Sequence, residues 1–167
     1  MAKANLTAQQ LRDLLSYNPA SGDFVRIAHA YQNSGRRSAV GAIGRVTNAG
    51  YHLIGVRGNY YTAHRLAWLY VYGRWPVHHI DHIDGNPLNN RINNLRECSH
   101  AQNMQNMRRA HADSASGLLG AYQRGHKWVS MICHGRRQMY LGTFNTAEEA
   151  HAAYIEAKRN IHGFCTI

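Results

Sequence analysis

The sequence predicts an α+β protein with two small domains joined by a linker. In the first domain, residues 1–110, an apolar helix at residues 62–72 leads into a segment at 77–110 with two short strand-like runs and a capped helix. Small polar residues at 111–117 are typical of a linker. Residues 118–167 then form the second domain, which suits a chain of 167 residues.

The N-terminal part of the first domain predicts a β-rich extension. Residues 7–16 indicate a short helix with leucines on one face, and Asp23–Ala28 indicates a strand. The polar, Gly/Ser/Arg-rich residues 31–42 indicate a loop against a ligand. Residues 43–62 indicate a hairpin that turns at Gly58-Asn59.

The second domain shows three strand-like runs separated by turns at Gly125 and Gly135. The runs are Leu118–Gln123, Trp128–Cys133 and Met139–Phe144. A helix that begins at Thr146 follows, with acids in its first turn and a stripe of alanines that permits close approach to a sheet. This pattern predicts a three-stranded antiparallel sheet packed on one helix.

The charge of the chain is strongly positive. Lys and Arg total 19 against 9 Asp and Glu, which gives a net charge of +10 and a pI near 10.0. This balance favours a nucleic-acid partner, although a basic protein without a polyanionic ligand is the alternative. Residues 1–75 carry nine basic and two acidic residues, whereas residues 76–110 carry four basic and three acidic ones. We therefore expect phosphate-holding charge on the flanks and a near-neutral centre.

The cysteine pattern and the lack of long apolar segments indicate the cellular compartment of the protein. Cys98, Cys133 and Cys165 are odd in number and form no CxxC pair, which favours a reducing environment without disulfides or a cysteine-bound zinc. An apolar signal core and an apolar run of 18 residues are both lacking. We therefore expect a cytoplasmic protein that does not contact a membrane.

Four polar residues in the 77–110 segment suit the hydrolysis of a phosphodiester. One divalent metal can offset the charge of the transition state and of the leaving oxygen, and hard oxygen ligands favour Mg²⁺ or Mn²⁺. Asp81 can supply a charged oxygen and an Asn carbonyl a neutral one. His82 can then act as the general base, and Asn94 can accept a hydrogen bond from its ring. Asn103 lies on the predicted helix of the segment.

These residues and the blocks around them resemble the HNH motif of phage-type homing endonucleases. The resemblance covers roughly residues 5–110, and the blocks are His64–Trp68, Gly73–Pro76, Ile80–Asn86 and Asn90–Arg96. It implies a ββα-metal fold in which His82 is the general base, Asn94 orients it, and Asp81 and Asn103 bind the metal. Asn103 replaces a histidine that other members carry, which favours an oxygen-liking metal over zinc. The cysteines for a structural zinc are also lacking.

Several residues outside this set are candidate contacts to DNA. His78 and His79 either touch the scissile phosphate or simply lie on the strand. Arg65 either holds a phosphate or forms an internal salt bridge. We also expect DNA contacts from arginines of the N-terminal extension, namely Arg36, Arg37 and Arg45.

Residues 117–163 resemble an AP2 DNA-binding domain. The resemblance depends on Gly120–Tyr122, Lys127–Val129, Leu141–Phe144 and the helix from Glu148. It implies that the sheet reads the major groove of DNA. The residues expected to carry the contacts are Arg124, Lys127, Trp128, Arg136, Arg137 and Tyr140. Packing within the sheet is the alternative role of Trp128 and Tyr140.

Together these features predict a metal-dependent endonuclease that cuts double-stranded DNA to 5′-phosphate and 3′-hydroxyl ends, in a bacterial or phage-infected cell. A homing-type enzyme that nicks one strand and one that makes paired cuts both stay open, as do a monomer and a homodimer. The alternative is a non-catalytic DNA-binding regulator that uses the AP2-like domain. An RNA-binding protein is less favoured, because no stacking platform for single strands is recognisable.

Overall fold

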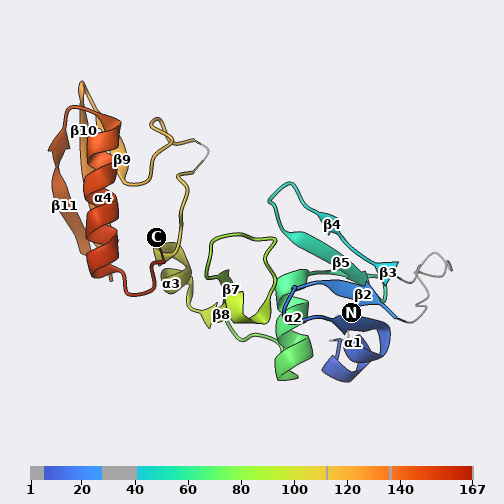
Figure 1. The fold of residues 1–167 in the computed structure, drawn as a ribbon. Coiled ribbons are helices and arrows are strands. Elements are labelled where there is room, and N and C mark those ends of the chain that lie inside the picture. Colours follow the sequence, from blue (N-terminus) through green and yellow to red (C-terminus); the bar gives the residue numbers. More distant parts are fainter. Residues whose placement is uncertain (1–5, 28–40, 112, 136, 167) are drawn as a thin grey trace, which may run out of the picture. The chain divides into compact units, whose positions relative to one another are not determined.

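The computed structural model of the chain describes residues 6–27, 41–111, 113–135 and 137–166. It has mixed α+β structure with small antiparallel sheets, as Figure 1 shows. The chain divides into two compact units, Met1–Cys98 (unit 1) and Ser99–Ile167 (unit 2). The division at residues 111–117 stays a prediction.

Unit 1 begins with a capped helix that leads directly into a sheet. Helix α1 (Ala8–Leu14) starts at a capping box of Thr7 and Gln10. Strands β1 (Leu15–Tyr17), β2 (Phe24–Arg26) and β3 (Gly41–Ala42) pair antiparallel in that order. The predicted helix and strand are present, but the helix ends at Leu14 because β1 pairs with β2. Of the predicted loop at residues 31–42, residues 31–40 lie outside the described residues. Its last two residues form strand β3 instead of a loop.

A second sheet of unit 1 contains the predicted hairpin. Strands β4 (Arg45–Val46), β5 (His52–Val56) and β6 (Asn59–Thr62) pair antiparallel in chain order. Val56 pairs with Asn59, and both Arg57 and Gly58 have positive φ, 51° and 78°. The turn therefore lies at Arg57-Gly58, one residue before the predicted position, because two positive φ angles suit a two-residue hairpin turn.

Helix α2 (Ala63–Tyr72) carries much of the core of unit 1. It ends at Gly73, which takes the left-handed conformation with φ 73°. Its buried side chains meet those of α1, β1, β2 and β5. The buried apolar residues of this core are Leu6, Leu11, Leu15, Tyr17, Phe24, Ile54, Val56, Ala63, Leu66, Ala67, Trp68, Leu69 and Leu95.

The last elements of unit 1 are the two strands expected in the 77–110 segment. Strand β7 (His79–His82) pairs antiparallel with β8 (Leu95–Cys98), so that His82 lies opposite Leu95 and Asp81 opposite Arg96. A 3-10 turn, η1 (Ile92–Asn94), precedes β8. Residues 83–91, here termed the site loop, connect β7 to η1.

Unit 2 begins with the helix that the sequence predicts after these strands. Helix α3 (His100–Gln105) starts at a capping box of Ser99 and Gln102. A three-stranded antiparallel sheet and a helix follow, in agreement with the sequence prediction. The strands, in the order β11-β10-β9, are β9 (Ala121–Arg124), β10 (Lys127–His134) and β11 (Arg137–Phe144). The helix is α4 (Ala147–Ile161), capped by Thr146.

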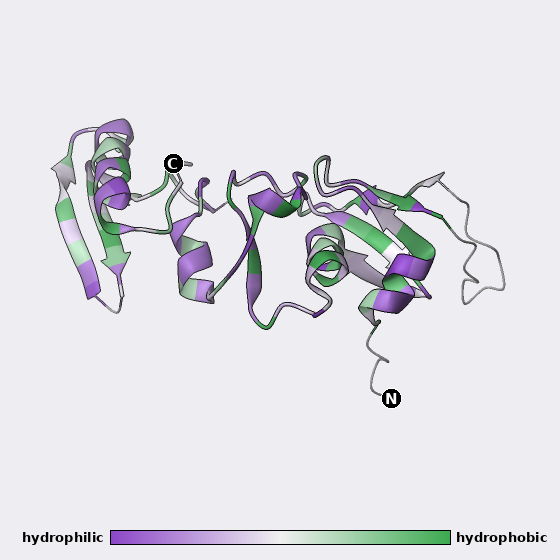
Figure 2. Ribbon diagram, turned by 60° about the horizontal axis from the view of Figure 1, so that its bottom comes forward, coloured by the Kyte–Doolittle hydropathy of each residue, from purple (hydrophilic) through white to green (hydrophobic). Residues whose placement is uncertain are grey.

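The core of unit 2 combines alanines with aliphatic side chains. Ala121, Ala147 and Ala150 form one buried cluster, and Leu118, Trp128 and Phe144 pack against it. Leu119, Val129 and Ile132 are buried as well. Helix α4 carries hydrophilic and hydrophobic residues along its length (Figure 2), as expected for a helix with one face on a sheet.

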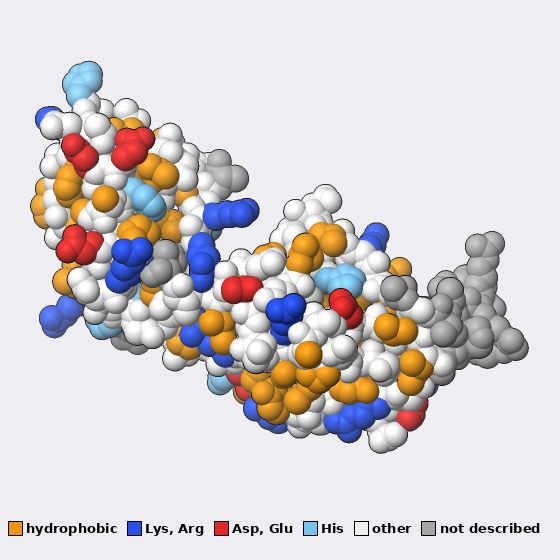
Figure 3. Space-filling view, in the orientation of Figure 1, with side chains coloured by type: hydrophobic (Ala, Val, Ile, Leu, Met, Phe, Trp, Pro, Cys, Tyr) orange, Lys and Arg blue, Asp and Glu red, His pale blue; other side chains and the backbone are white. Residues whose placement is uncertain are grey.

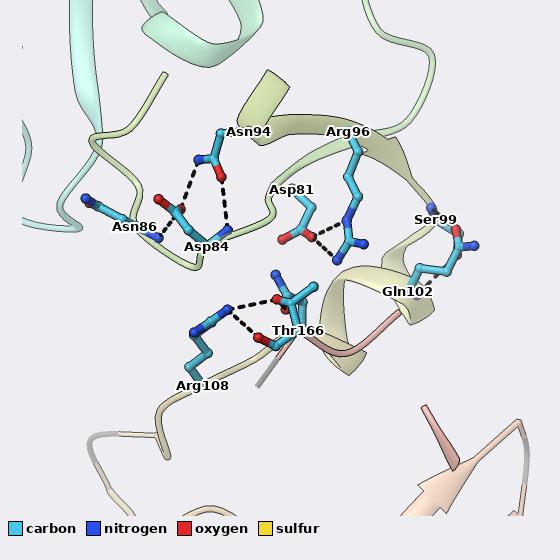
Figure 4. Close-up of polar contacts among 10 residues, drawn as sticks. Asp81, Asp84, Asn86, Asn94, Arg96, Ser99, Gln102, Arg108 and Thr166 are labelled. Atoms are coloured by element: carbon cyan, nitrogen blue, oxygen red, sulfur yellow. Dashed lines mark hydrogen bonds and ion pairs between the residues drawn. The ribbon is translucent and has the colours of Figure 1, made fainter. Parts of the chain in front are cut away.

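Polar contacts bind the end of unit 2 to the segment after α3. The buried Lys158 donates to the carbonyl oxygen of Met107. Thr166 Oγ1 donates to Asn106 Oδ1 at 2.7 Å, and Arg108 donates to the carbonyl and the hydroxyl of Thr166 at 3.0 and 2.8 Å (Figure 4). These hydrogen bonds therefore hold residues 106–108 against the end of unit 2.

Candidate active site

Asp84 and Asn94 organise the site loop. The backbone N–H of Asp84 donates to Asn94 Oδ1 at 3.0 Å, and Asn94 Nδ2 donates to Asp84 Oδ1 at 2.9 Å (Figure 4). Asn94 Nδ2 also donates to the carbonyl of Asn89 at 2.9 Å. Asn86 and Asn89 also donate to the Asp84 carboxylate, at 2.8 and 2.7 Å. Burial raises the pKa of Asp84, but these hydrogen bonds together outweigh it and lower that pKa. The ionised Asp84 is therefore the centre of the loop.

His82 lies at the end of β7 and is buried. Its Nε2 is 3.3 Å from the side-chain oxygen of Asn90. Burial lowers the pKa of His82, and the hydrogen bond with Asn90 and the carboxylates of Asp84 and Asp81 oppose that shift only in part. A neutral imidazole at neutral pH is the form that can accept a proton.

Two further rings pack near His82. The ring of His64, from α2, lies 5.1 Å from that of His82 at 88°, and the ring of Tyr51 lies 5.5 Å from His64 and 6.3 Å from His82. His64 Nε2 is 3.1 Å from Thr62 Oγ1. Burial, and then the charges of His82 and Arg65, lower the pKa of His64 to about 3. His64 is therefore neutral at physiological pH and supports the His82 ring by packing.

Asp81 is buried beside His82 and forms an ion pair across the strands. Arg96 donates to Asp81 Oδ2 from Nε at 2.9 Å, and its second nitrogen lies at 2.8 Å (Figure 4). The two residues are direct partners in the β7–β8 register. Arg96 therefore compensates the carboxylate charge that burial would otherwise disfavour.

The structure brings together three of the four predicted catalytic residues within unit 1. Asp81 and His82 are neighbours on β7, and Asn94 holds the loop that follows them. Asn103 lies on α3, in unit 2. The sequence predicts that Asn94 contacts the His82 ring. In the structure Asn90 contacts the ring instead, and the Asn94 amide binds residues 84 and 89.

The start of β7 is held by Glu97. Arg74 donates to Glu97 at 2.9 Å, and the backbone N–H groups of Val77 and His78 donate to its other oxygen, the latter at 3.0 Å. The hydrogen bond from Arg74, then that from His78, lowers the pKa of Glu97 to about 2. The side chains of His78 and His79 are exposed at this point.

Two of the arginines of unit 1 that the sequence singled out, Arg45 and Arg65, lie over aromatic rings. The guanidinium of Arg65 lies 5.8 Å from the centre of the Trp75 ring, and that of the exposed Arg45 lies 5.3 Å from the centre of the Tyr60 ring. Both distances suit cation–π contacts. Arg36 and Arg37 lie outside the described residues.

The candidate DNA contacts of unit 2 divide into exposed and packed residues. Arg124 and Lys127 are exposed and lie directly opposite each other on β9 and β10, and Tyr140 on β11 is 64% exposed. Arg137, at the start of β11, is exposed as well. Trp128 instead packs against the alanine core, which is the packing role left open for it. Arg136 lies outside the described residues.

The basic side chains do not form one block on the face that Figure 3 shows. Lys and Arg are scattered among hydrophobic and neutral side chains on each unit there. Charge alone therefore marks no single DNA-binding area on this face.

The residues around His82 fit an oxygen-liking metal. Across the described ranges, no group of three or more His, Cys, Asp and Glu side chains is arranged to hold a metal ion. The charged donor near His82 is the Asp81 carboxylate, whose Oδ2 is paired with Arg96, and Mg²⁺ often binds through one carboxylate while it keeps several waters and takes phosphate oxygens. The donor set therefore suits Mg²⁺ or Mn²⁺ better than zinc.

Comparison with known proteins matches one segment of the chain to a family model. Residues 61–105 match the family model described as HNH endonuclease, and this span contains all four predicted catalytic residues. No curated protein and no solved structure matches the chain. The match supports a nuclease enzyme, and it implies DNA as the substrate and a divalent metal as the cofactor. In the part of the chain that the structure describes, no helix is long and apolar enough to span a membrane.

Sequence reasoning missed the supporting roles of Tyr51, His64 and Asn90. The three residues come from different elements, and only folding brings them to His82. The sequence marks two of them, because His64 and Asn90 are the first residues of two of the blocks that resemble the HNH motif.

Proposed function

We propose that the protein is a metal-dependent, homing-type HNH endonuclease that hydrolyses duplex DNA to 5′-phosphate and 3′-hydroxyl ends. The observation that carries this proposal is the buried His82 beside Asp81 at the end of β7, followed by a loop that Asp84 and Asn94 hold. A single site of this kind nicks one strand most simply.

Each residue has a separate role in this proposal. His82 takes the proton from the attacking water, and its lowered pKa keeps it in the accepting form. Asp81 and Asn103 hold Mg²⁺ or Mn²⁺, which when bound offsets the charge of the phosphorane and of the leaving oxygen. Asn94 keeps the loop after His82 in place through Asp84. His78, His79 and Arg65 are candidates for holding phosphates.

Unit 2 contributes DNA affinity in the manner of an AP2-like sheet. Exposed Arg124, Lys127, Arg137 and Tyr140 are the contacts that the structure favours, because Trp128 is used for packing. Tethering raises the effective concentration of this sheet at DNA that unit 1 already holds.

Incubation of the full chain with supercoiled plasmid and Mg²⁺ or Mn²⁺ tests the proposal. We expect open circles from nicking, loss of activity with EDTA, and a loss of several orders of magnitude in His82→Ala without loss of DNA binding. His52→Ala, on β5 of the same unit, is the matched control and should retain activity. Linear product would mean paired cuts. DNA binding without any cleavage would favour the non-catalytic regulator.

A further inference from the structure

Asn90 is a buried amide whose orientation is determined by its contacts. It is 2% exposed. Its Nδ2 donates to the carbonyl of Leu88 at 3.1 Å, so its Oδ1 is the atom that lies 3.3 Å from His82 Nε2. The reversed amide would place two acceptor oxygens, those of Asn90 and Leu88, against each other.

This orientation determines which nitrogen of His82 carries the hydrogen. The amide oxygen can only accept, so Nε2 must donate, and a neutral imidazole that is protonated on Nε2 has its lone pair on Nδ1. We propose that Asn90 is a positioning residue that selects the Nε2–H tautomer of His82 and thereby makes Nδ1 the atom that accepts the proton of the attacking water. The inference rests on the proposed function.

The proton balance of this step is simple. The O–H bond of the water breaks as its oxygen bonds to phosphorus, and the proton moves to Nδ1. The P–O3′ bond breaks, and the 3′ oxygen leaves and takes a proton from solvent to give the 3′-hydroxyl end. The resulting imidazolium carries a hydrogen on both nitrogens, and Nε2 continues to donate to Asn90. The hydrogen bond to Asn90 therefore persists and strengthens as the ring becomes charged.

The N-terminal extension holds Asn90 in place. The hydroxyl of Tyr17 donates to the carbonyl of Asn90 at 2.7 Å, and Ile92 N–H donates to the carbonyl of Pro19 at 3.3 Å. A Cβ at Gly22, where φ is +82°, would meet the carbonyl carbon of Asn90 at 2.6 Å. Residues 17–22 therefore pack closely on the segment that carries Asn90.

The other side of the His82 ring is also supported. His64 stands perpendicular to it, and Tyr51 packs on both rings. A ring flip that exchanged the two nitrogens would break the bond to Asn90, so packing and hydrogen bonding favour the same ring orientation.

A direct test measures the tautomer of His82 by long-range ¹H–¹⁵N NMR on the full, metal-free chain at a pH where the ring is neutral. We expect the Nε2–H form. Two histidines serve as internal references, because His162 Nε2 faces the carbonyl of Cys133 at 2.8 Å and His151 Nδ1 faces that of Leu119 at 2.7 Å. An Nδ1–H form or a mixture at His82 overturns the proposal, whatever the activity of the chain.

Two variants separate tautomer selection from simple structural support. Asn90→Leu removes the acceptor, and we expect a tautomer mixture and a kcat about 10- to 100-fold lower at unchanged KM. Asn90→Asp keeps an acceptor oxygen toward His82 but sets its second oxygen against the carbonyl of Leu88, so we expect it to retain the Nε2–H form at a lower stability. An Asp variant that loses the Nε2–H form, or a Leu variant with full activity, overturns the proposal.

Tyr17→Phe tests the support from the N-terminal extension without touching the site. It keeps the buried ring and removes only the donor to Asn90, so we expect a kcat lowered a few-fold and a partial tautomer mixture. If Asn90→Leu does not fold, this variant and the wild-type spectrum decide the question. A wild-type chain that shows the Nε2–H form but cleaves no plasmid contradicts the proposed function rather than the tautomer assignment.

Discussion

Unit 1 and unit 2 bury different kinds of residue. Unit 1 has a core of large aliphatic and aromatic side chains, whereas the buried apolar side chains described in unit 2 are three alanines together with Leu119, Val129 and Ile132. The buried polar residues also have different places. In unit 1 most of them surround the candidate site, namely Asp81, His82, Asn90 and Asn94. In unit 2, Asn106 and Lys158 join the segment after α3 to the chain end.

The difference indicates that the two units are stabilised in different ways. A large apolar core can offset the unfavourable burial of a polar site, so unit 1 can hold His82 and Asp81 away from water. Unit 2 has a smaller core and depends more on a few hydrogen bonds, so we expect it to open locally at lower free energy. Each variant below tests one side of this comparison.

Lys158→Ala should have the largest effect on stability. Lys158 is 0% exposed, and truncation removes its packed stem and the donor to Met107, which should cost about 2–5 kcal/mol in unit 2. Lys158→Met keeps the stem and is the matched control, with an expected loss of about 1–2 kcal/mol. Hydrogen exchange should show faster opening of β9–β11 and α4 but unchanged protection in α2. Equal loss of protection in both units would contradict the expected lower local stability of unit 2.

Asn94→Ala should affect catalysis in unit 1. It removes three hydrogen bonds that hold the site loop, and we expect about 10- to 100-fold slower plasmid nicking with little change in DNA binding. The exposed neighbour Asn93 provides the control, since Asn93→Ala should retain the activity. A normal rate in Asn94→Ala would show that the loop needs no such support.

Glu97→Gln should destabilise unit 1 in a pH-dependent manner. The folded-state pKa is about 2 against an ordinary 4.5, so the ionised carboxylate contributes stability fully above pH 4.5 and loses it as the pH falls toward 2. We expect a loss of about 1–2 kcal/mol at pH 7 that shrinks by pH 3. Urea unfolding of the variant and of the wild type at both pH values measures this.

Arg45→Ala should have the smallest effect, on DNA binding alone. If this exposed residue holds one phosphate, the slope of log affinity against log salt should fall by about one and the affinity by a few-fold. Arg12→Ala is the control, because Arg12 donates to the carbonyl of Tyr70 within the protein. The slope should be unchanged in that variant, although its stability should be lower.

Features that depend on neighbouring residues could be predicted from the sequence. The capping boxes at Thr7, Ser99 and Thr146 depend on residues three positions apart, and all three are present. The hairpin turn was misplaced by one residue, because the chain accepts a positive φ at Arg57 rather than at Asn59. Strands β1 and β3 could not be predicted, since each exists only through pairing with β2.

The sequence by itself predicted the residues of the candidate site. Asp81 and His82 on β7 and Asn94 directly before β8 lie within the residues that match the HNH family model, and the antiparallel pairing of the two strands brings them close in space. Only the tertiary structure decided which amide serves which partner. Asn90 and Asn94 are four residues apart and chemically identical, yet one binds His82 and the other Asp84. The direction of a buried amide depends on the groups around it, here the carbonyls of Leu88 and Asn89, and these are brought together by folding.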